Sequence, residues 1–433
     1  MSTVTAAPVG ALSGTLQVPP DKSITHRAIL LAAISDRTVR VTAPLDSADT
    51  AATLNAVEAC GVRVEGHLGD EIVVHGVGRL GLRPPPAIDC ANAGTLMRLL
   101  PALLVGVPCD HVILDGDDSL RRRPMSRIAR PLRAMGAALF TAPGGTAPLV
   151  VSGGTPLNGM RHELQVASAQ VKSCILLAGL GAEGPTWVHE PTPSRDHTER
   201  MLTAAGVGVV RDGEDVGVLG RCEGLSLPDL RVPGDFSSAA FHLVAGTLLA
   251  DPEVRLEGVN LNPLRAGLLD VMRRMGADVT VEEGEPVAGE PCGTLIVRRS
   301  RGLTATEVEP HEVAAMIDEL TLIGVLGAMA AGTTTVRGAA ELRVKESDRI
   351  TAVVDALTGM GVRAAELEDG FSVTGGERIP GGTIDARGDH RLAMLGAIAG
   401  LASVDGVAID GFEAVAVSYP GFVADLRSIG GVA

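Results

Sequence analysis

Two kinds of helical pattern alternate along the chain. The first kind is apolar on nearly every side and rich in Ala and Gly, as in "HRAILLAAI" and "HRLAMLGAIAGLAS". The second kind is amphipathic and ends in Gly followed by a small residue, as in "LNAVEACGV" and "VMRRMGA". A helix that is apolar all round belongs in a protein interior, whereas an amphipathic helix covers a core. The pattern therefore predicts central buried helices with amphipathic helices around them.

The glycines that end the amphipathic segments recur at similar intervals. They are Gly61, Gly136, Gly206, Gly276, Gly361 and Gly430, with spacings of 75, 70, 70, 85 and 69 residues. Each glycine stands where the C-terminal end of a helix favours a positive φ, and strand-like alternation such as "ADVTVEE" follows several of them. Self-similarity at a fixed period indicates a repeated unit. We therefore predict six copies of a unit made of a buried helix, a strand, an amphipathic helix and two further strands.

Proline-containing breaks divide these copies into two groups. One break, at residues 18–19, precedes the first buried helix, and the other, at residues 232–234, precedes the fourth. Proline holds its predecessor in extended geometry and ends regular structure, so both breaks suit crossings between domains. We predict an α/β fold, a two-domain inside-out α/β barrel in which each domain has three βαβαββ-type repeats around central helices. The domains are residues 20–232, and residues 1–19 together with 233–433, with the active site in the cleft between them.

Composition narrows the class of ligand. The formal net charge is -15 and only 2% of residues are aromatic, so the chain lacks both the basic surface and the stacking platforms that nucleic acids need. No P-loop, dinucleotide turn or metal-ligand constellation occurs, so we expect no cofactor and no metal. The ligands should be small molecules.

Location and assembly follow from the same composition. The apolar runs are shorter than the ~20 residues that span a bilayer, and the N-terminal residues lack a signal peptide pattern. The six cysteines form no C-x-x-C pair, as is usual for reduced core thiols. We expect a cytoplasmic protein that does not bind membranes and is a monomer.

Polar residues gather at the N-terminal ends of the buried helices. They are Lys22, Ser23 and Arg27; Asn92, Gly94, Thr95 and Arg98; Ser168, Ala169, Gln170 and Lys172; Asp235, Ser237 and Ser238; Asp318 and Glu319; and Asp389, His390 and Arg391. Because a helix N-terminus is already positive, Lys22 and Arg27 are unfavourable there unless an anion balances them. Six such ends predict an anion-binding cleft. Taken singly, each group also fits an ordinary helix cap, a glycine turn or a structural histidine.

Loops add further charged groups. They are Arg121, Arg122, Arg123 and Arg127 in "GDDSLRRRPMSR", Ser194 and Arg195 in "PSRDHTER", and Lys345, Glu346 and Arg349 in "RVKESDR". A solvated charge run is the alternative for the first segment. A capped helix start is the alternative for the last.

The segments "DKSITHR", "NAGTLMR", "RRRPM", "SAQVKS", "PSRDHTE", "IDEL", "KESDR" and "GDHRLAM" together closely resemble the 5-enolpyruvylshikimate-3-phosphate synthase family. The resemblance runs in order over most of the chain. It implies transfer of the enolpyruvyl group of phosphoenolpyruvate to the 5-hydroxyl of shikimate 3-phosphate, with release of phosphate through a tetrahedral intermediate. Both substrates are small polyanions, which would balance the cations described above.

The resemblance also implies roles for individual residues. The residues expected to bind shikimate 3-phosphate are Lys22, Ser23, Arg27, Ser168, Ala169, Gln170, Ser194, Arg195, Asp318 and Lys345. Those expected to bind phosphoenolpyruvate are Lys22, Asn92, Gly94, Arg123, Gln170, Arg349, His390 and Arg391. The expected catalytic residues are Asp318, Glu346, Lys22 and Lys345. Asp318 would accept the hydroxyl proton, and Glu346 would exchange a proton with the methylene carbon.

Two positions depart from the family pattern, and two other functions stay open. Val417 stands where many members have a Lys, and Glu341 where others have an Asn. One alternative is the related transferase that acts on UDP-N-acetylglucosamine, which usually has a reactive Cys in the loop where this chain has Asp117 and Asp118. The other is a non-catalytic anion-binding repeat protein, which would not need Asp318 or Glu346.

Overall fold

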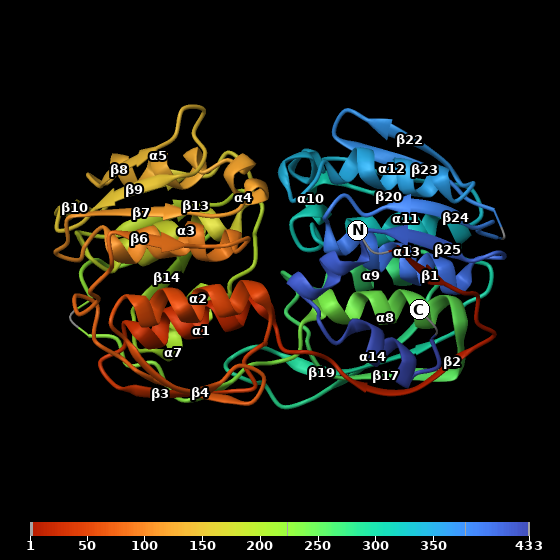
Figure 1. Ribbon diagram of the computed structural model, residues 1–433, viewed down its shortest axis with the longest axis horizontal. Coiled ribbons are helices and arrows are strands. Elements are labelled where there is room, and N and C mark those ends of the chain that lie inside the picture. The colour runs from red at the N-terminus through yellow and green to blue at the C-terminus, as the bar shows by residue number, and fades with distance from the viewer. Residues whose placement is uncertain (1–2, 223, 377, 432–433) are drawn as a thin grey trace. The chain divides into compact units, whose positions relative to one another are not determined.

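The computed structural model describes residues 3–222, 224–376 and 378–431, and the chain divides into two compact units (Figure 1). The first unit contains residues 20–232 and 287–290, and the second contains residues 1–19, 233–286 and 291–433. Residues 1–2, 223, 377 and 432–433 belong to the predicted domains but lie outside the described residues. One segment departs from the predicted bounds. Residues 287–290 pack within the first unit, where buried Glu290 Oε1 lies 2.7 Å from Nδ1 of buried His197.

The first unit is built around helices that are buried along nearly their whole length. These are α1 (Lys22–Ala33), α3 (Gly94–Leu104) and α6 (Ala169–Gly179), and α3 packs against both of the others. The surrounding helices are α2 (Ala48–Ala59), α4 (Asp118–Arg122), α5 (Ser126–Ala134) and α7 (His197–Ala204).

The sheets of the first unit share one plan. Their orders are β16-β3-β5-β4, β6-β7-β9-β8 and β11-β13-β15-β14, and in each the first pair is parallel and the other two are antiparallel. The strands are β3 (Thr38–Thr42), β4 (Arg63–His67), β5 (Glu71–His75), β6 (Ala87–Asp89), β7 (His111–Asp115), β8 (Ala138–Thr141), β9 (Leu149–Ser152), β11 (Arg161–Glu163), β13 (Thr186–His189), β14 (Val209–Asp212), β15 (Asp215–Val218) and β16 (Leu230–Arg231). A short pair joins β10 (Leu157–Asn158) to β12 (Ala182–Glu183). Burial alternates along strands such as β3, so one face of the sheet covers the helices and the other faces outward.

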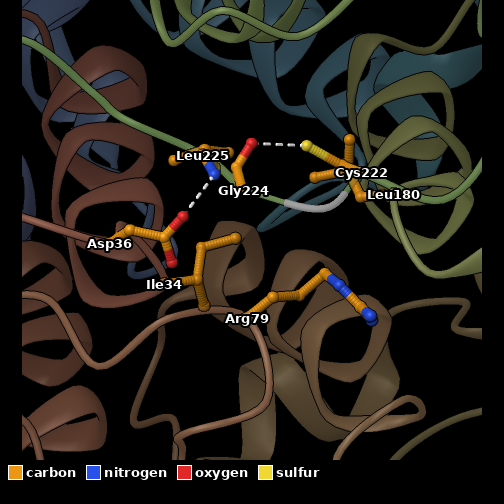
Figure 2. Close-up of a pocket in the computed structure, with 7 residues that line it drawn as sticks. All are labelled: Ile34, Asp36, Arg79, Leu180, Cys222, Gly224 and Leu225. Atoms are coloured by element: carbon orange, nitrogen blue, oxygen red, sulfur yellow. Dashed lines mark hydrogen bonds between the residues drawn. The ribbon is translucent and has the colours of Figure 1, made fainter.

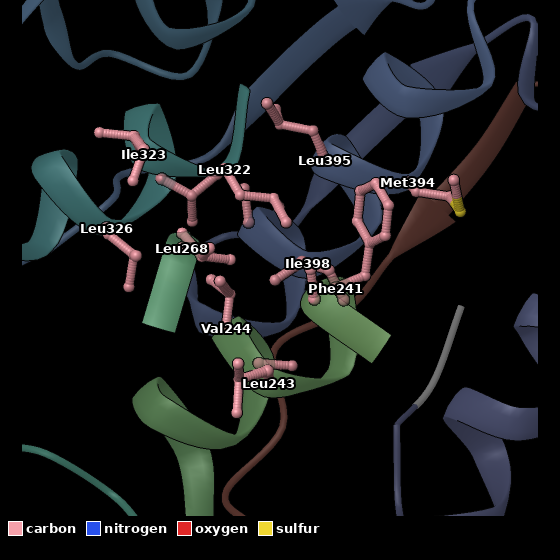
Figure 3. Packing of buried hydrophobic residues seen from close by; sticks show 14 of the residues in the cluster. Phe241, Leu243, Val244, Leu268, Leu322, Ile323, Leu326, Met394, Leu395 and Ile398 are labelled. Carbon is pink, nitrogen blue, oxygen red and sulfur yellow. The ribbon is translucent and has the colours of Figure 1, made fainter. Parts of the chain in front are cut away.

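The second unit has its own central helices, α8 (Phe236–Leu249), α11 (Leu320–Met329) and α13 (His390–Ala402). The other helices are α9 (Leu268–Arg274), α10 (Pro310–Val313), α12 (Arg349–Gly359), α14 (Phe422–Ser428) and the short 3-10 helices η1 (Ala340–Val344) and η2 (Phe412–Val417). Figure 3 shows Phe241 and Val244 of α8, Leu322 of α11 and Ile398 of α13 within one buried cluster. The apolar run of each helix is thus explained by neighbours on all sides.

Sheets cover this second core as well. Their orders are β18-β19-β17-β2, β20-β21-β23-β22 and β1-β25-β24. The strands are β1 (Thr3–Ala6), β2 (Leu12–Gln17), β17 (Ala250–Asn260), β18 (Asp278–Glu283), β19 (Cys292–Arg298), β20 (Glu307–Val308), β21 (Thr333–Val336), β22 (Arg363–Leu367), β23 (Gly370–Thr374), β24 (Gly382–Asp385) and β25 (Val407–Asp410). The N-terminal strands β1 and β2 therefore complete sheets whose other strands come from the second half of the chain.

The predicted α/β fold with central buried helices is confirmed. The predicted positive φ is confirmed at every one of the six repeat glycines, from 78° at Gly361 to 105° at Gly136. Each of these glycines directly follows the C-cap residue of an amphipathic helix, where a side chain would be strained.

Other expectations concern the thiols and the membrane. The six cysteines are free, but Cys109 and Cys222 are only half-buried, so the expectation of core thiols is wrong for these two. Within the described ranges, no helix is both long and apolar enough to cross a bilayer.

Close packing between central helices and sheets gives a test of this fold. A Cβ at Gly400 on α13 would lie 2.8 Å from the backbone oxygen of Ala6, whereas a Cβ at Gly324 on α11 would meet only side-chain methyl groups at 3.1 Å. We expect Gly400→Ala to lower the free energy of unfolding by about 1–3 kcal/mol, because backbone cannot yield as a side chain can. Gly324→Ala is the matched control and should stay near neutral, since its gain of up to about 1 kcal/mol in helix propensity offsets mild crowding. Urea unfolding of both variants measures the difference, and equal stabilities would contradict this packing.

Candidate active site

The start of α1 carries its own compensating carboxylates. Asp21 caps the helix by accepting a hydrogen bond of 2.8 Å from the Ile24 N–H. Lys22 Nζ lies 2.9 Å from Asp49 Oδ2 on α2. The interpretation that Lys22 is tolerable only when an anion is bound is therefore wrong, because Asp49 already balances its charge in the folded chain.

Arg27 is a buried cation with a different set of partners. Its Nε donates to Thr198 Oγ1 at 2.7 Å, its Nη2 to Ser173 Oγ at 2.9 Å, and its Nη1 to the Ser23 carbonyl at 3.0 Å. Burial lowers the pKa of Arg27 to about 10, and nearby Arg195 acts in the same direction. Arg27 thus stays protonated at neutral pH while its described hydrogen-bond acceptors are uncharged, and this arrangement favours an incoming anion.

Asn92, Gly94 and Arg123 come together at the start of α3. Helix α3 begins at Gly94 without a side-chain cap. The Arg123 Nη2 donates to Asn92 Oδ1 at 2.8 Å, and the Asn92 amide donates to Asp117 Oδ2 at 2.7 Å. A Cβ at Gly94 would lie 2.8 Å from Arg123 Nη1. The guanidinium therefore lies directly over the uncapped end of the helix, where backbone N–H groups suit an anion.

The start of α6 is joined to the same group. Ser168 caps α6, and Ala169 is its first residue. The Gln170 side chain accepts from Arg98 Nη1 at 2.7 Å and donates to Thr95 Oγ1 at 3.0 Å, and both partners lie on α3. Gln170 is thereby tied to the start of α3, near Asn92, Gly94 and Arg123, whereas Lys22 is paired with Asp49 on α2.

Asp318 is the centre of the corresponding group in the second unit. Its Oδ1 lies 3.4 Å from Lys345 Nζ and 3.6 Å from Arg349 Nη1, and its Oδ2 lies 3.4 Å from Arg265 Nη1. Its backbone carbonyl accepts from Arg391 Nη1 at 2.9 Å. Three cations around one carboxylate stabilise its negative charge.

Arg349 joins the two candidate proton-transfer groups. Its Nη2 donates to Glu346 Oε2 at 2.6 Å, and its Nε donates to Asp389 Oδ2 at 2.8 Å. Burial alone would lower the pKa of Arg349, but the charges of Asp389, Glu346 and Asp318 outweigh burial and raise it above the ordinary value. Arg349 is therefore a permanent cation, and its guanidinium contacts both Asp318 and Glu346.

One supporting residue of this group, Arg265, escaped the sequence prediction, whereas Asp389 was predicted only as a polar residue at a helix start. Arg265 lies between β17 and α9, pairs with Asp235, Asp318 and Glu319, and has a side chain only 4% exposed. No repeat or motif marks it, so no signal in the sequence could have found it. Asp389 caps α13 as well as holding Arg349, and only its place at a helix start indicated it. His390 is the first residue of α13 and is buried.

The two departures from the family pattern lie on the short 3-10 helices of the second unit. Val417 is half-buried at the end of η2, and Glu341 lies within η1.

A small pocket in the first unit lies at the opposite end of the central helices. Its lining residues are Ile34, Asp36, Arg79, Leu180, Cys222, Gly224 and Leu225 (Figure 2). Ile34 and Leu180 are the C-cap residues of α1 and α6, whereas the predicted ligand residues Lys22 and Ser168 stand at the N-terminal ends of the same helices. The pocket is therefore separate from the candidate site.

Comparison with known proteins gives a consistent result. A sequence profile described as "EPSP synthase (3-phosphoshikimate 1-carboxyvinyltransferase)" matches residues 6–426. The chain is 47% identical over 427 residues to the 3-phosphoshikimate 1-carboxyvinyltransferase of Halorhodospira halophila, covering 98% of this chain and 95% of the relative. It is 45% identical to that of Methylococcus capsulatus, covering 98% and 97%. A solved EPSP synthase from Acinetobacter baumannii superposes with a TM-score of 0.87 at 41% identity, covering 99% of this chain and 98% of that one.

The position of Arg123 over Gly94 can be tested directly. In Gly94→Ala the new methyl group would meet Nη1 of Arg123 at 2.8 Å and of Arg98 at 3.0 Å, both at the ends of flexible side chains. The fold should survive, but the displaced guanidinium should raise KM for phosphoenolpyruvate by about tenfold or more, as expected for loss of a charged hydrogen bond. Gly106→Ala is the control, because its methyl group meets Arg79 at the other end of α3. Equal KM values for the two variants would contradict the predicted site.

Proposed function

The chain belongs to the EPSP synthase family, and on that premise we propose that the predicted residues of both units form one active site. The enzyme transfers the enolpyruvyl group of phosphoenolpyruvate to shikimate 3-phosphate in the shikimate pathway. The alternative acceptor, UDP-N-acetylglucosamine, is not favoured by these relatives. We further propose binding and catalytic roles for individual residues of this chain.

We assign the binding of shikimate 3-phosphate to residues from each unit. They are Lys22, Ser23, Arg27, Ser168, Ala169, Gln170, Ser194 and Arg195 from the first unit, and Asp318 and Lys345 from the second. Support comes from Arg27, a buried cation whose hydrogen-bond acceptors in the described part of the chain are neutral. A phosphate group would supply the charge-assisted hydrogen bonds that such a guanidinium favours.

We assign the binding of phosphoenolpyruvate to a second set of residues. It consists of Lys22, Asn92, Gly94, Arg123, Gln170, Arg349, His390 and Arg391. The bonded group of Asn92, Gly94 and Arg123 at the uncapped start of α3 supports the phosphate or carboxylate contacts. The permanent charge of Arg349 supports the phosphoenolpyruvate contacts that we assign to the second unit.

The geometry around Asp318 carries the proposed chemistry. Its carboxylate, held by Lys345, Arg349 and Arg265, accepts the proton of the 5-hydroxyl. Glu346 gives a proton to the methylene carbon of phosphoenolpyruvate, and the hydroxyl oxygen bonds to the neighbouring carbon to form a tetrahedral intermediate. The bond between that carbon and the phosphate oxygen then breaks, the leaving phosphate takes the proton held by Asp318, and the methyl group returns a proton to Glu346. Cationic groups such as Lys22 stabilise the leaving phosphate.

Substrate arrival would prepare Glu346 for this step. In the folded chain its carboxylate accepts from Arg349 at 2.6 Å, which favours the ionised form. When the anionic substrate takes over that guanidinium, Glu346 loses this hydrogen bond and gains a proton more easily. Arg349 would thereby couple binding to proton transfer.

We also propose that the enzyme is cytoplasmic, acts as a monomer and does not bind nucleic acid. The free thiols support the first point, since cytosolic proteins keep cysteines reduced. The net charge of -15 supports the last.

Release of inorganic phosphate tests the reaction. Phosphoenolpyruvate should release phosphate only when shikimate 3-phosphate is also present. Asp318→Asn should lower kcat by roughly 10²–10⁴-fold, the usual contribution of a general base, while calorimetry still detects binding of shikimate 3-phosphate. Turnover of Asp318→Asn at the unchanged rate would rule out its role as the base.

Variants from either unit test the shared site. Arg195→Ala in the first unit and Lys345→Ala in the second should each raise KM for shikimate 3-phosphate by about tenfold or more, since each removes a charged contact. Arg211→Ala and Arg337→Ala, which change arginines outside the proposed site in each unit, serve as controls. If only one unit's variants affect this KM, the two units do not share the substrate.

A further inference from the structure

A buried ion cluster anchors the segment between β13 and α7. Lys172 on α6 has a fully buried side chain whose Nζ lies 2.9 Å from Glu190 Oε2, 2.8 Å from Glu199 Oε1 and 2.9 Å from the Ser194 carbonyl. An ammonium group has three hydrogens to donate. Lys172 donates hydrogen bonds to Glu190 and the Ser194 carbonyl and forms an ion pair with Glu199. We call these four residues the Lys172 cluster.

Stability alone does not account for this cluster. Taking charges out of water costs several kcal/mol per ion, and buried ion pairs can often be replaced by apolar residues at no loss of stability. What the buried hydrogen bonds among Lys172, Glu190 and Ser194 do provide is one defined arrangement of these groups. The role of the cluster therefore depends on which residues it holds in place.

Ser194 is held at both of its polar ends. Its carbonyl accepts from Lys172, and its hydroxyl donates to Glu190 Oε1. Because a serine hydroxyl has a single proton, this bond fixes the rotamer and leaves lone pairs of Oγ facing elsewhere. Arg195, the next residue, has its backbone anchored at this point.

The same elements also hold Arg27. Ser173 follows Lys172 on α6, Thr198 precedes Glu199 on α7, and both hydroxyls accept from Arg27. The two hydroxyls also lie 2.7 Å apart. Groups expected to bind shikimate 3-phosphate thus attach to α6 and α7 beside the Lys172 cluster.

We propose that Lys172 and Glu190 are positioning residues for shikimate 3-phosphate, acting through Ser194 and the adjoining Arg195. Glu190 sets the direction of the Ser194 hydroxyl, and Lys172 ties the main chain of the segment to α6. Neither needs to touch the substrate. We rest this on the proposed function, since shikimate 3-phosphate is the ligand that it names.

Glu190→Gln is the informative substitution. The amide keeps the size of the side chain but has only one acceptor oxygen. That oxygen should stay on Lys172, because an N–H group facing an ammonium is repelled, so the amide N–H would face Ser194 and reverse the hydrogen bond. The Ser194 hydroxyl would then turn, and KM and Kd for shikimate 3-phosphate should rise roughly tenfold, the size expected for one buried hydrogen bond. We expect kcat and KM for phosphoenolpyruvate to change less than about twofold.

Glu199→Gln is the matched control. Glu199 pairs with the same lysine and is nearly as buried, with a side chain 7% exposed against 1% for Glu190. The Ser194 hydroxyl, however, donates to Glu190 and not to Glu199. Glu199 also lies near Arg27, so the control tests loss of charge close to a ligand residue. The Kd of Glu199→Gln for shikimate 3-phosphate should stay within about twofold of the Kd of the unchanged protein. Equal effects of Glu190→Gln and Glu199→Gln, or no effect of Glu190→Gln, would overturn the positioning role.

Two further variants keep the test decisive. If Glu190→Gln does not fold, Glu190→Asp keeps the charge beside Lys172 but is too short for both bonds, and it should raise the same Kd. The double variant Glu190→Gln with Ser194→Ala should bind no worse than Ser194→Ala alone, because Glu190 acts through that hydroxyl. Additive losses would contradict this.

Calorimetry separates this inference from the proposed function. Unchanged protein that binds shikimate 3-phosphate without turnover would refute the proposed reaction, and the Kd ratios would still decide the role of Glu190. Unchanged protein that does not bind shikimate 3-phosphate would refute both.

Discussion

Burial of whole helices inside each unit is the constraint on which the rest of the structure depends. A helix leaves its first four N–H groups without partners, and an apolar core cannot satisfy them. The starts of α1, α6, α8 and α13 meet this need with Asp21, Ser168, Asp235 and Asp389. These helix starts therefore carry polar side chains, and several of the residues that we propose to bind substrate lie there.

Two of the central helices, α3 and α11, differ from the others in how they begin. Helices α3 and α11 begin without a side-chain cap bond, next to Gly94 and Asp318 respectively. At α3 the open N–H groups lie beside Arg123, so an anion would find both a helix end and a guanidinium. At α11 the neighbouring cations surround the carboxylate of Asp318 instead. These cations are Lys345, Arg349 and Arg265. The two helix starts are thus suited to opposite tasks, binding an anion and accepting a proton.

Carboxylates of the chain hold these cations in place without any ligand. Lys22 has Asp49, Arg349 has Glu346 and Asp389, and Arg265 has three acidic partners. An unpaired buried charge would cost several kcal/mol. Such pairs balance these cations within the fold, and a substrate anion would compete with the carboxylates for them. Arg27 differs, because the acceptors described for it are hydroxyl and carbonyl oxygens.

Local chemistry was sufficient to predict much of this protein. The periodicity of apolar residues identified the central helices, and the six glycines marked helix ends because only glycine adopts positive φ without strain. The positions of Lys22, Gly94 and Asp318 at helix starts followed from the same patterns. Only the tertiary structure determined which charged residues pair with one another. Asp49 beside Lys22, Arg265 beside Asp318, and Glu190 with Glu199 around Lys172 join segments far apart in sequence. No periodicity records such pairings, because each arises only when separate elements pack and bring their charges within a few ångströms.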